Sequence, residues 1–147
     1  VAGVPIRNVD MTPYCLGMAF DFNSAPYRVT TEISANEEFQ NPEFVGGGMI
    51  GVARALFESI GGFDEGIANH LAEVDFCLSA KEKNHPPQYL PECLGILFKE
   101  TFNSISGDEV SDDNEAWKRR VRFFAKWVGQ LPKDENFMHF AKDLLKV

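Results

Sequence analysis

The sequence predicts one α/β domain, in which a short mixed sheet is flanked by helices and the C-terminal part is helical. Two observations predict this class: stretches typical of short strands alternate with segments of helical periodicity, and no internal repeat is present. The 147 residues, 44% of them hydrophobic and 24% charged, suffice for one hydrophobic core. We therefore expect a single domain over residues 1–147, with residues 112–147 as a helical tail packed on it.

The N-terminal third is expected to be extended and irregular. Short strands are predicted at residues 14–20 and 27–31, where aromatic and β-branched side chains are frequent. Gly46-Gly47-Gly48 then interrupts the chain, and the apolar residues 49–52 that follow predict a buried strand. Prolines exclude a long helix before the glycines. They are Pro5, Pro13, Pro26 and Pro42.

Two helices are predicted in the middle of the chain. Residues 53–60 are good helix formers and end at Gly61-Gly62, a usual stop signal. A second helix over residues 67–83 must end before Pro86-Pro87. Its apolar face consists of Ile67, Leu71, Val74 and Leu78. Strands are expected on both sides of the turn that follows, at residues 88–91 and 94–98.

The C-terminal region is predicted to be a polar loop followed by two helices. Residues 103–114 are polar and acidic, which is typical of a mobile surface loop. The first helix ends at Pro132, and a short last helix covers residues 137–145. The apolar stripe of the first helix is Trp117, Val121, Phe124, Val128 and Leu131. Its N-cap candidates are Asp112, Asp113 and Asn114.

Charge is divided unevenly along the chain. Residues 1–117 hold 6 basic and 19 acidic side chains, a net charge of −13, whereas residues 118–147 hold 8 basic and 3 acidic ones, a net charge of +5. An acidic body argues against a nucleic-acid partner. The basic segment has two interpretations, a peripheral contact with an anionic membrane or a sugar diphosphate, and a solvated helix face that balances the preceding acids. Its basic residues include Lys118, Arg119, Arg120, Arg122 and Lys126.

A cytoplasmic location is expected, peripheral at the membrane under the first of those interpretations. No apolar run is long enough to cross a bilayer, and the N-terminus carries no signal-peptide pattern. Cys15, Cys77 and Cys93 show no C-x-x-C spacing, which favours a reducing compartment and small core residues over disulfides or zinc ligands. The three histidines, His70, His85 and His139, show no metal-ligand spacing either.

Glu73 and Asp75 are the acids best placed for chemistry. They lie near the start of the predicted helix 67–83, where the positive end of the helix dipole favours a carboxylate. Two helical residues that are two positions apart diverge by about 200° around the axis, so they cannot both serve one atom. One of them could act as a general base on a hydroxyl, while the other supports structure or is solvated. A solvated helix face is the simpler alternative for both.

Four segments resemble family 2 glycosyltransferases of the GT-A fold, in order and in spacing. Residues 46–65 resemble the family's glycine-rich strand, helix and G-G-F-D-E turn. Residues 72–79, A-E-V-D-F-C-L-S, resemble its acidic E-D-x-D-L-C-x-R motif. Tyr89-Leu90-Pro91 resembles its Y-x-P strand, and Phe123 to Trp127 resembles its F-x-x-K-W element. The resemblance covers residues 42–131 and implies the acceptor-side, C-terminal part of that nucleotide-diphospho-sugar transferase fold.

The resemblance implies transfer of a glycosyl unit, of the hexosyl class, from a nucleotide-sugar to a hydroxyl of a saccharide, lipid or protein acceptor. Glu73 aligns with the family's catalytic aspartate and would deprotonate that hydroxyl. A divalent cation, Mn²⁺ or Mg²⁺, is implied for a full-length relative, whereas no cofactor or metal site is expected in this chain. The expected substrate-binding residues are Gly46, Gly47, Gly48, Phe63, Asp64, Glu65 and Asp75.

The sequence also departs from the family pattern. Ala72 stands where the family usually has Glu, Glu73 where it has Asp, and Ser79 where it often has Arg. The donor half and its strand-ending D-x-D are missing, because Asp21-Phe22-Asn23 lies too close to Gly46 to be that motif. By itself the chain is therefore expected not to bind a nucleotide-sugar. The alternative is a non-catalytic glycan- or protein-binding module that retained the scaffold, and exposed apolar surface on a half-fold would favour a homo-oligomer.

Overall fold

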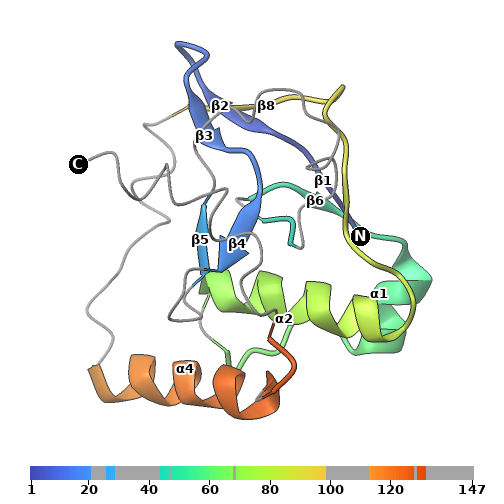
Figure 1. The fold of residues 1–147 in the computed structure, drawn as a ribbon, viewed down its shortest axis with the longest axis vertical. Helices are drawn as coiled ribbons and strands as arrows, with labels where there is room; N and C mark the ends of the chain where they lie inside the picture. The colour runs from blue at the N-terminus through green and yellow to red at the C-terminus, as the bar shows by residue number, and fades with distance from the viewer. Residues whose placement is uncertain are drawn as a thin grey trace.

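The computed structural model is a mixed α/β structure (Figure 1). It describes residues 1–20, 26–28, 44–46, 48–67, 69–98, 113–127 and 129–131, and everything below refers to those ranges. Three helices and eight short strands lie within them. The predicted α/β class is confirmed. None of the described helices is long and apolar enough to cross a bilayer.

The strands form two small mixed sheets and one antiparallel pair. The first sheet has the order β6-β1-β7, from Ile50–Gly51, Ala2–Gly3 and Gln88–Tyr89. The second has the order β3-β2-β8, from Pro13–Cys15, Ile6–Asn8 and Gly95–Leu97. In each, the central strand is antiparallel to one neighbour and parallel to the other. The antiparallel pair joins β4, Met18–Phe20, to β5, Pro26–Arg28.

Two of the strand predictions need correction. The strand predicted at residues 14–20 is divided into β3 and β4, because Gly17 has a φ of 135° and lets the chain leave one sheet for another. The strand predicted at residues 49–52 is reduced to Ile50–Gly51 and is not buried, since Met49 is 51% exposed. The strands predicted at residues 88–91 and 94–98 are confirmed in shorter form as β7 and β8.

The two predicted middle helices are confirmed. α1 spans Arg54–Ile60 and ends at Gly61, whose left-handed φ of 92° allows the N–H groups of Gly61 and Gly62 to bond the Phe57 carbonyl at 3.1 and 3.0 Å. α2 spans Asn69–Glu82, and the expected apolar face, from Ile67 to Leu78, is buried. The chain leaves α2 through Asn84, which has a φ of 62°, before the two prolines.

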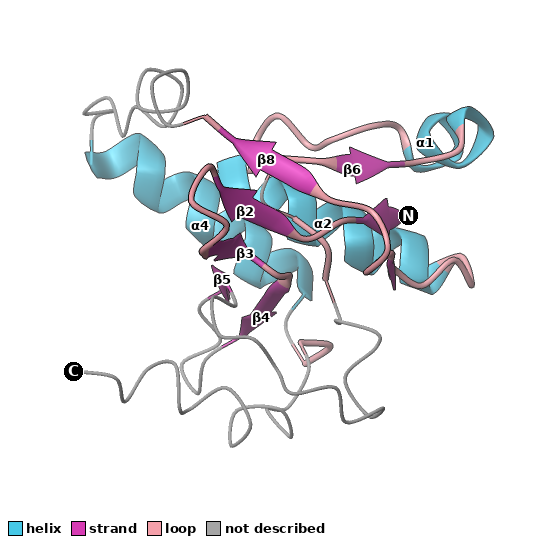
Figure 2. Cartoon of the chain, turned by 90° about the horizontal axis from the view of Figure 1, so that it is seen from above, coloured by secondary structure: helices cyan, strands magenta, loops and turns pink. Residues whose placement is uncertain are grey.

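α2 is the central element of the fold. The strands lie on one side of it and α4, Asp113–Trp127, lies along the other (Figures 1 and 2). One core cluster therefore includes residues from all three layers. Its buried members are Met18, Phe44, Val45, Ile67, Leu71, Val74, Cys77, Leu78, Phe123 and Trp127. A smaller cluster of Ile6, Cys15 and Leu97 lies within the second mixed sheet.

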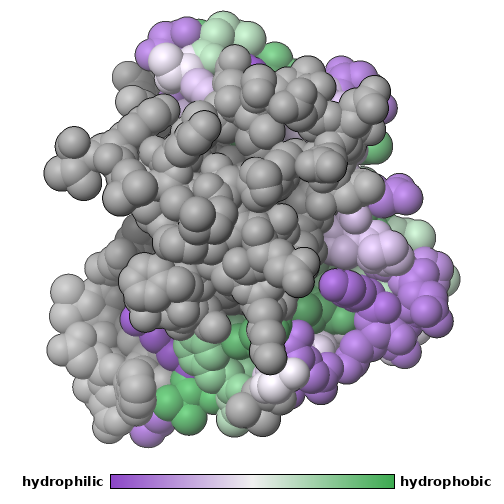
Figure 3. Space-filling view, in the orientation of Figure 1, coloured by the Kyte–Doolittle hydropathy of each residue, from purple (hydrophilic) through white to green (hydrophobic). Residues whose placement is uncertain are grey.

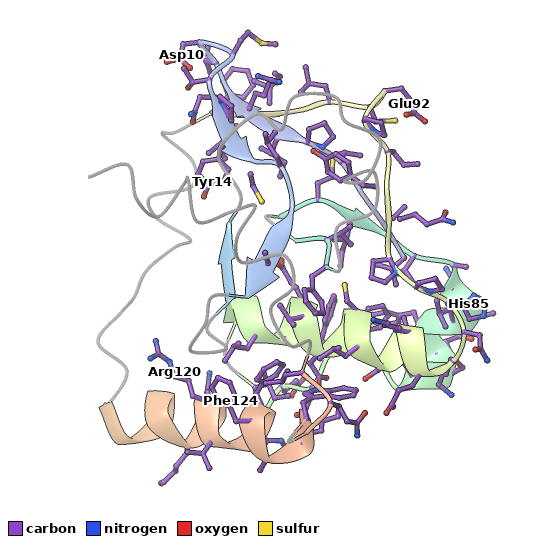
Figure 4. The ribbon with its side chains drawn as sticks, viewed as in Figure 1. Asp10, Tyr14, His85, Glu92, Arg120 and Phe124 are labelled. Carbon is purple, nitrogen blue, oxygen red and sulfur yellow. The ribbon has the colours of Figure 1, made fainter. Side chains whose placement is uncertain are left out.

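The buried side of α4 differs from the predicted stripe. Phe123 and Trp127 are buried, whereas Val121, a predicted stripe residue, is 44% exposed. Phe124 and Leu131 pack partly against the core, and Figure 4 shows Phe124 extending from α4 toward α2. The buried face differs from the predicted stripe because α4 packs on α2 through Phe123 and Trp127, which lie one helical turn apart. The end of the loop predicted at residues 103–114 is wrong, because α4 already begins at Asp113. The rest of that loop, the side chain of Trp117, all of Val128, Pro132 and the helix at 137–145 lie outside the described residues.

Gly3 is needed where β1 approaches the segment before the glycine run. A Cβ on Gly3 would overlap the Cβ of Val45 and lie 2.6 Å from its Cγ1. Val45 is buried, and its β-branched side chain has little freedom to move aside. A larger residue at position 3 would therefore push β1 away from the core.

We expect Gly3→Ala to lower the free energy of unfolding by about 2 kcal/mol, the cost of overpacking a close contact. Urea unfolding followed by circular dichroism measures it. Gly51→Ala in the neighbouring strand β6 is the matched control, because a Cβ there would meet only the Ala2 carbonyl at 4.0 Å. Equal effects of the two substitutions would contradict the steric argument.

Candidate functional site

Glu73 lies against the first glycine of the glycine run. Its Oε2 lies 2.8 Å from the position that a Cβ on Gly46 would occupy, and the Met18 Sδ would overlap the same position. Gly46 is buried, so only a residue without a side chain lets the carboxylate and the thioether approach the backbone together. The structure thus brings Glu73 and Gly46 together, as the resemblance implies.

The segment that carries Gly46 is fixed by contacts on both sides. The Phe44 carbonyl accepts a hydrogen bond from the Met18 N–H at 3.2 Å. The Cys77 thiol donates to the Val45 carbonyl at 3.6 Å, and the Cys15 Sγ lies 3.7 Å from the Gly46 carbonyl and 3.3 Å from the Gly17 carbonyl. Burial raises the pKa of Cys77 to about 11, so this thiol keeps its proton and acts as a donor at neutral pH. Gly46 therefore has little freedom to move relative to α2.

The remaining glycines of the run differ in their surroundings. Gly48 is exposed and has a φ of 98°, which favours glycine, while Gly47 lies outside the described residues. The prediction that all three residues line a substrate site therefore remains a prediction for Gly47 and Gly48. For Gly46, the structure shows the approach of the candidate base directly.

Asp75 points to the opposite side of α2 and is held by α4. Its Oδ1 accepts a hydrogen bond from the Trp127 Nε1 at 2.7 Å and forms an ion pair with the Lys126 Nζ at 2.7 Å. Asp75 is only 3% exposed and Trp127 only 2%, so this pairing satisfies a carboxylate within the core. The predicted divergence of Glu73 and Asp75 around the helix is confirmed, and Asp75 is the acid that supports structure.

The Gly61–Gly66 turn combines an aromatic cluster with a paired acid. Phe63 packs on Phe57 and Phe76 with ring centroids 5.7 and 5.1 Å apart, yet it remains 41% exposed. Asp64 accepts the Gly66 N–H at 2.9 Å through Oδ1, and its Oδ2 accepts the Nε and Nη2 of Arg122 at 3.1 and 3.0 Å. The next acid of the turn, Glu65, is exposed.

The pKa of Asp64 reflects these contacts. Partial burial alone would raise the pKa of this carboxyl, but the Gly66 N–H and the Arg122 guanidinium outweigh that effect and hold the pKa below its usual value. The Arg122 guanidinium also explains why a glycine occupies position 66, because a Cβ there would lie 2.8 Å from the guanidinium carbon. The turn and α4 are thus joined by one charged contact.

Arg122, Lys126 and Trp127 are structural partners that pattern reasoning from charge did not identify. From the sequence, their segment had two interpretations, an anion-binding face and a solvated face. In the structure, Arg122 pairs with Asp64 of the turn before α2, and Lys126 pairs with Asp75 of α2. The signal that could have found them is spacing. Arg122 and Lys126 are four positions apart, which is about one helical turn, and a Trp beside the Lys supplies a donor for a buried acid.

The cysteines and histidines contribute no metal centre in the described part of the chain. Cys15 and Cys77 are buried as expected, but Cys93 is exposed, so the prediction that it is a core residue is wrong. His85 lies at the C-terminal end of α2 and is exposed (Figure 4). The side chain of His70 and all of His139 lie outside the described residues. Within the described ranges, no three His, Cys, Asp or Glu side chains gather in a way that could hold a metal ion.

The chain was compared with known proteins at the levels of family, sequence and structure. No protein-family model, curated protein or solved structure matches it.

We expect Asp75→Asn to lower the free energy of unfolding by about 2 kcal/mol, because the substitution removes a buried charge that pairs with Lys126 and bonds Trp127. Urea unfolding followed by Trp fluorescence measures the change. Glu82→Gln at the exposed end of the same helix should change stability by less than about 0.5 kcal/mol. A stability of Asp75→Asn within that same range would show that the pairing contributes nothing net.

The ion pair of Asp64 leads to a prediction about how the stability of the protein depends on pH. Because its pKa is lower in the folded state than in the unfolded chain, this carboxylate contributes stability that is fully present above its ordinary pKa of 3.8 and is lost as pH falls through the lower folded pKa. Asp64→Asn should therefore reduce stability by up to about 1 kcal/mol at pH 6 and by less at pH 2 to 3. Thermal unfolding of both proteins across this range checks it. A difference that does not shrink on acidification would count against the ion pair.

Proposed function

We propose that this chain is the acceptor-side part of a GT-A glycosyltransferase, resembling family 2, and that it moves a glycosyl unit from a nucleotide-sugar to an acceptor hydroxyl. The four resembling segments supply the motive. In this proposal the small mixed sheets and α2 correspond to the acceptor half of that fold, and α4 is the helical element packed on it.

The observation that carries the proposal is the placement of Glu73 against Gly46, with Asp75 turned to the other side of α2. Segments of the resemblance that lie far apart in the chain also contact one another. The F-x-x-K-W element supplies both partners of Asp75, and the G-G-F-D-E turn is bound to α4 through Asp64 and Arg122.

In the proposed reaction Glu73 removes the proton from the acceptor hydroxyl. The acceptor oxygen then forms a bond with the anomeric carbon, while the bond from that carbon to the diphosphate breaks and the nucleoside diphosphate leaves with the electron pair. The contacts of Glu73 with Gly46 fix the position of the base relative to the backbone. The exposed ring of Phe63 offers an apolar surface for the acceptor, and the Asp64 pairing with Arg122 holds that turn in place.

Two parts of the family scheme, the divalent cation and a substrate contact by Asp75, are not included in the proposal. The described residues provide no ligand set for a divalent cation, so no step is derived through Mn²⁺ or Mg²⁺. Asp75 belongs to the expected substrate-binding set, but its carboxylate already pairs with Lys126 and Trp127. We assign it the positioning of α4 rather than direct contact with substrate.

The second candidate is a glycan-binding module without catalysis. Phe63 favours it, because a half-exposed ring supported by Phe57 and Phe76 provides a rigid apolar platform for a ligand. The departures at Ala72 and Ser79 are consistent with lost chemistry. Binding without turnover separates this candidate from the transferase.

We expect Glu73→Gln to reduce transfer at least 100-fold in a full-length enzyme that contains this chain, since Gln cannot accept the proton and general-base catalysis contributes about 10² to 10⁴ in rate. Release of nucleoside diphosphate from UDP- and GDP-sugars with Mn²⁺ and a panel of acceptors measures it. Gln has nearly the shape of Glu, so the thermal unfolding of this variant should remain close to that of the parent protein.

Glu82→Gln is the matched control, an exposed acid near the C-terminal end of the same helix, and should keep full activity. Full turnover by Glu73→Gln would remove the assigned base. A parent protein that binds glycans on an array, loses that binding in Phe63→Ala and turns over no nucleotide-sugar would replace the transferase with the binding module.

A further inference from the structure

The second mixed sheet carries an apolar surface along its outer strand. β8 alternates strictly, because Gly95 and Leu97 are buried against the core while Ile96 is 39% exposed and Phe98 is 64% exposed. Leu94 precedes them on the same side and is 47% exposed. We call these three residues the β8 patch.

The β2–β3 hairpin extends the β8 patch. β2 and β8 run in parallel with Asn8 opposite Leu97, and Val9 follows β2 at the same end of this pair as Phe98 follows β8. Val9 is 60% exposed. A network at the hairpin tip, in which the Asn8 N–H bonds the Thr12 carbonyl at 2.8 Å and the Asp10 Oδ1 accepts the Thr12 N–H at 3.0 Å, holds Val9 in place. Apolar residues reach the surface at this upper end of the molecule (Figure 3).

β8 is a three-residue edge strand that contains no charge and no proline. Among the described strands, the order β3-β2-β8 leaves one side of β8 without a neighbour. The other edges of the two mixed sheets are blunted: Pro13 begins β3, β7 lies between Pro87 and Pro91, and β6 is two residues long. Residues 93–98, C-L-G-I-L-F, contain no charge and no proline. An edge of this kind is a site where another strand pairs.

The backbone of β8 is oriented for such pairing. The Gly95 N–H donates to the Pro5 carbonyl at 2.9 Å, toward β2. Alternate residues of a strand direct their backbone groups to opposite sides, so the N–H and carbonyl of Ile96 face the open edge. The exposed side chains and the unpaired backbone groups thus belong to the same residues.

We propose that β8 pairs with β8 of a second copy of this chain, antiparallel about a two-fold axis at Ile96. The two mixed sheets then form one continuous sheet, in which Leu94 of each copy lies opposite Phe98 of the partner copy. Such aliphatic–aromatic cross-strand pairs stabilise antiparallel sheets. Because the strand carries no charge, two acidic molecules meet there without like charges at the centre.

The apolar area is consistent with a dimer. At their exposed fractions the β8 patch and Val9 offer about 400 Å², within the range of the largest apolar patch on a typical monomer. A standard interface covers about 800 Å² on each partner, of which slightly more than half is apolar. Pairing at the edge covers the flanks of these side chains and so supplies part of that apolar share, and the backbone hydrogen bonds of β8 add to it.

Sedimentation equilibrium over about 1 to 100 µM protein tests this pairing. The parent chain should form a dimer, and Ile96→Lys should weaken dimerisation at least 100-fold, because a charge at the centre of an edge strand opposes pairing. Val121→Lys is the matched control, since Val121 is a similarly exposed apolar residue, 44%, on α4 at the opposite end of the molecule (Figure 1). It should leave the dimer unchanged.

Cross-linking tests the register independently of solubility. In a Cys93→Ser background, Ile96→Cys should form an intermolecular disulfide under mild oxidation, because directly opposed residues of antiparallel strands lie within disulfide range. Val121→Cys in the same background should not. A parent chain that stays monomeric, a dimer that survives Ile96→Lys, equal effects of the two lysines, or unlimited association in place of a dimer would each overturn the proposal. None of these results bears on Glu73, so the two proposals can fail separately.

Discussion

The buried carboxylate of Asp75 is the constraint on which the arrangement of helices depends. Lys126 and Trp127, consecutive residues of α4, both contact its Oδ1 at 2.7 Å, so the end of α4 is fixed relative to α2. Phe123 and Trp127 form an apolar surface on α4, and apolar packing alone would permit several registers against α2. The buried acid permits only the register in which its hydrogen-bond donors reach it. The net contribution of such a pair to stability is modest, because desolvation offsets most of the attraction. Its main effect is to select one packing.

The same constraint orients the candidate base. With Asp75 directed at α4, the helical period turns Glu73 toward the strands, where the segment from Phe44 to Gly46 lies. That segment is itself held by the Cys77 thiol, which donates to the Val45 carbonyl, and by the Met18 N–H, which donates to the Phe44 carbonyl. One helix thus directs two acids that are two residues apart to different sides, Asp75 to a structural pairing and Glu73 to the segment for which we propose a general base. Exchanging those roles would require α2 to rotate by half a turn, which the buried face from Leu71 to Leu78 does not permit.

Local signals in the sequence predicted the elements well and their partners poorly. Gly61 and the two prolines after α2 ended helices where expected, because these residues act through their own backbone geometry. The helical period likewise predicted that Glu73 and Asp75 diverge. The strand at residues 14–20 failed because apolar character continues through Gly17 while the backbone changes direction there. The stripe of α4 failed because its apolar residues fit two faces, and only contact with α2 and Asp75 decides between them.

Cys93 and Met49 show why burial was the least predictable property. Both are apolar residues in apolar surroundings along the chain, yet both are exposed, since sheets of three short strands have too little area to cover every flank. The surplus apolar surface gathers at β8, at the end of the molecule opposite α4 (Figure 1). On one side of α2, ion pairs of Asp75 and Asp64 therefore hold α4 in place. On the other side, the sheet β3-β2-β8 ends in the apolar strand β8. Within the described residues, the acids Asp64 and Asp75 are thus paired inside the chain, whereas β8 has a neighbouring strand on one side alone.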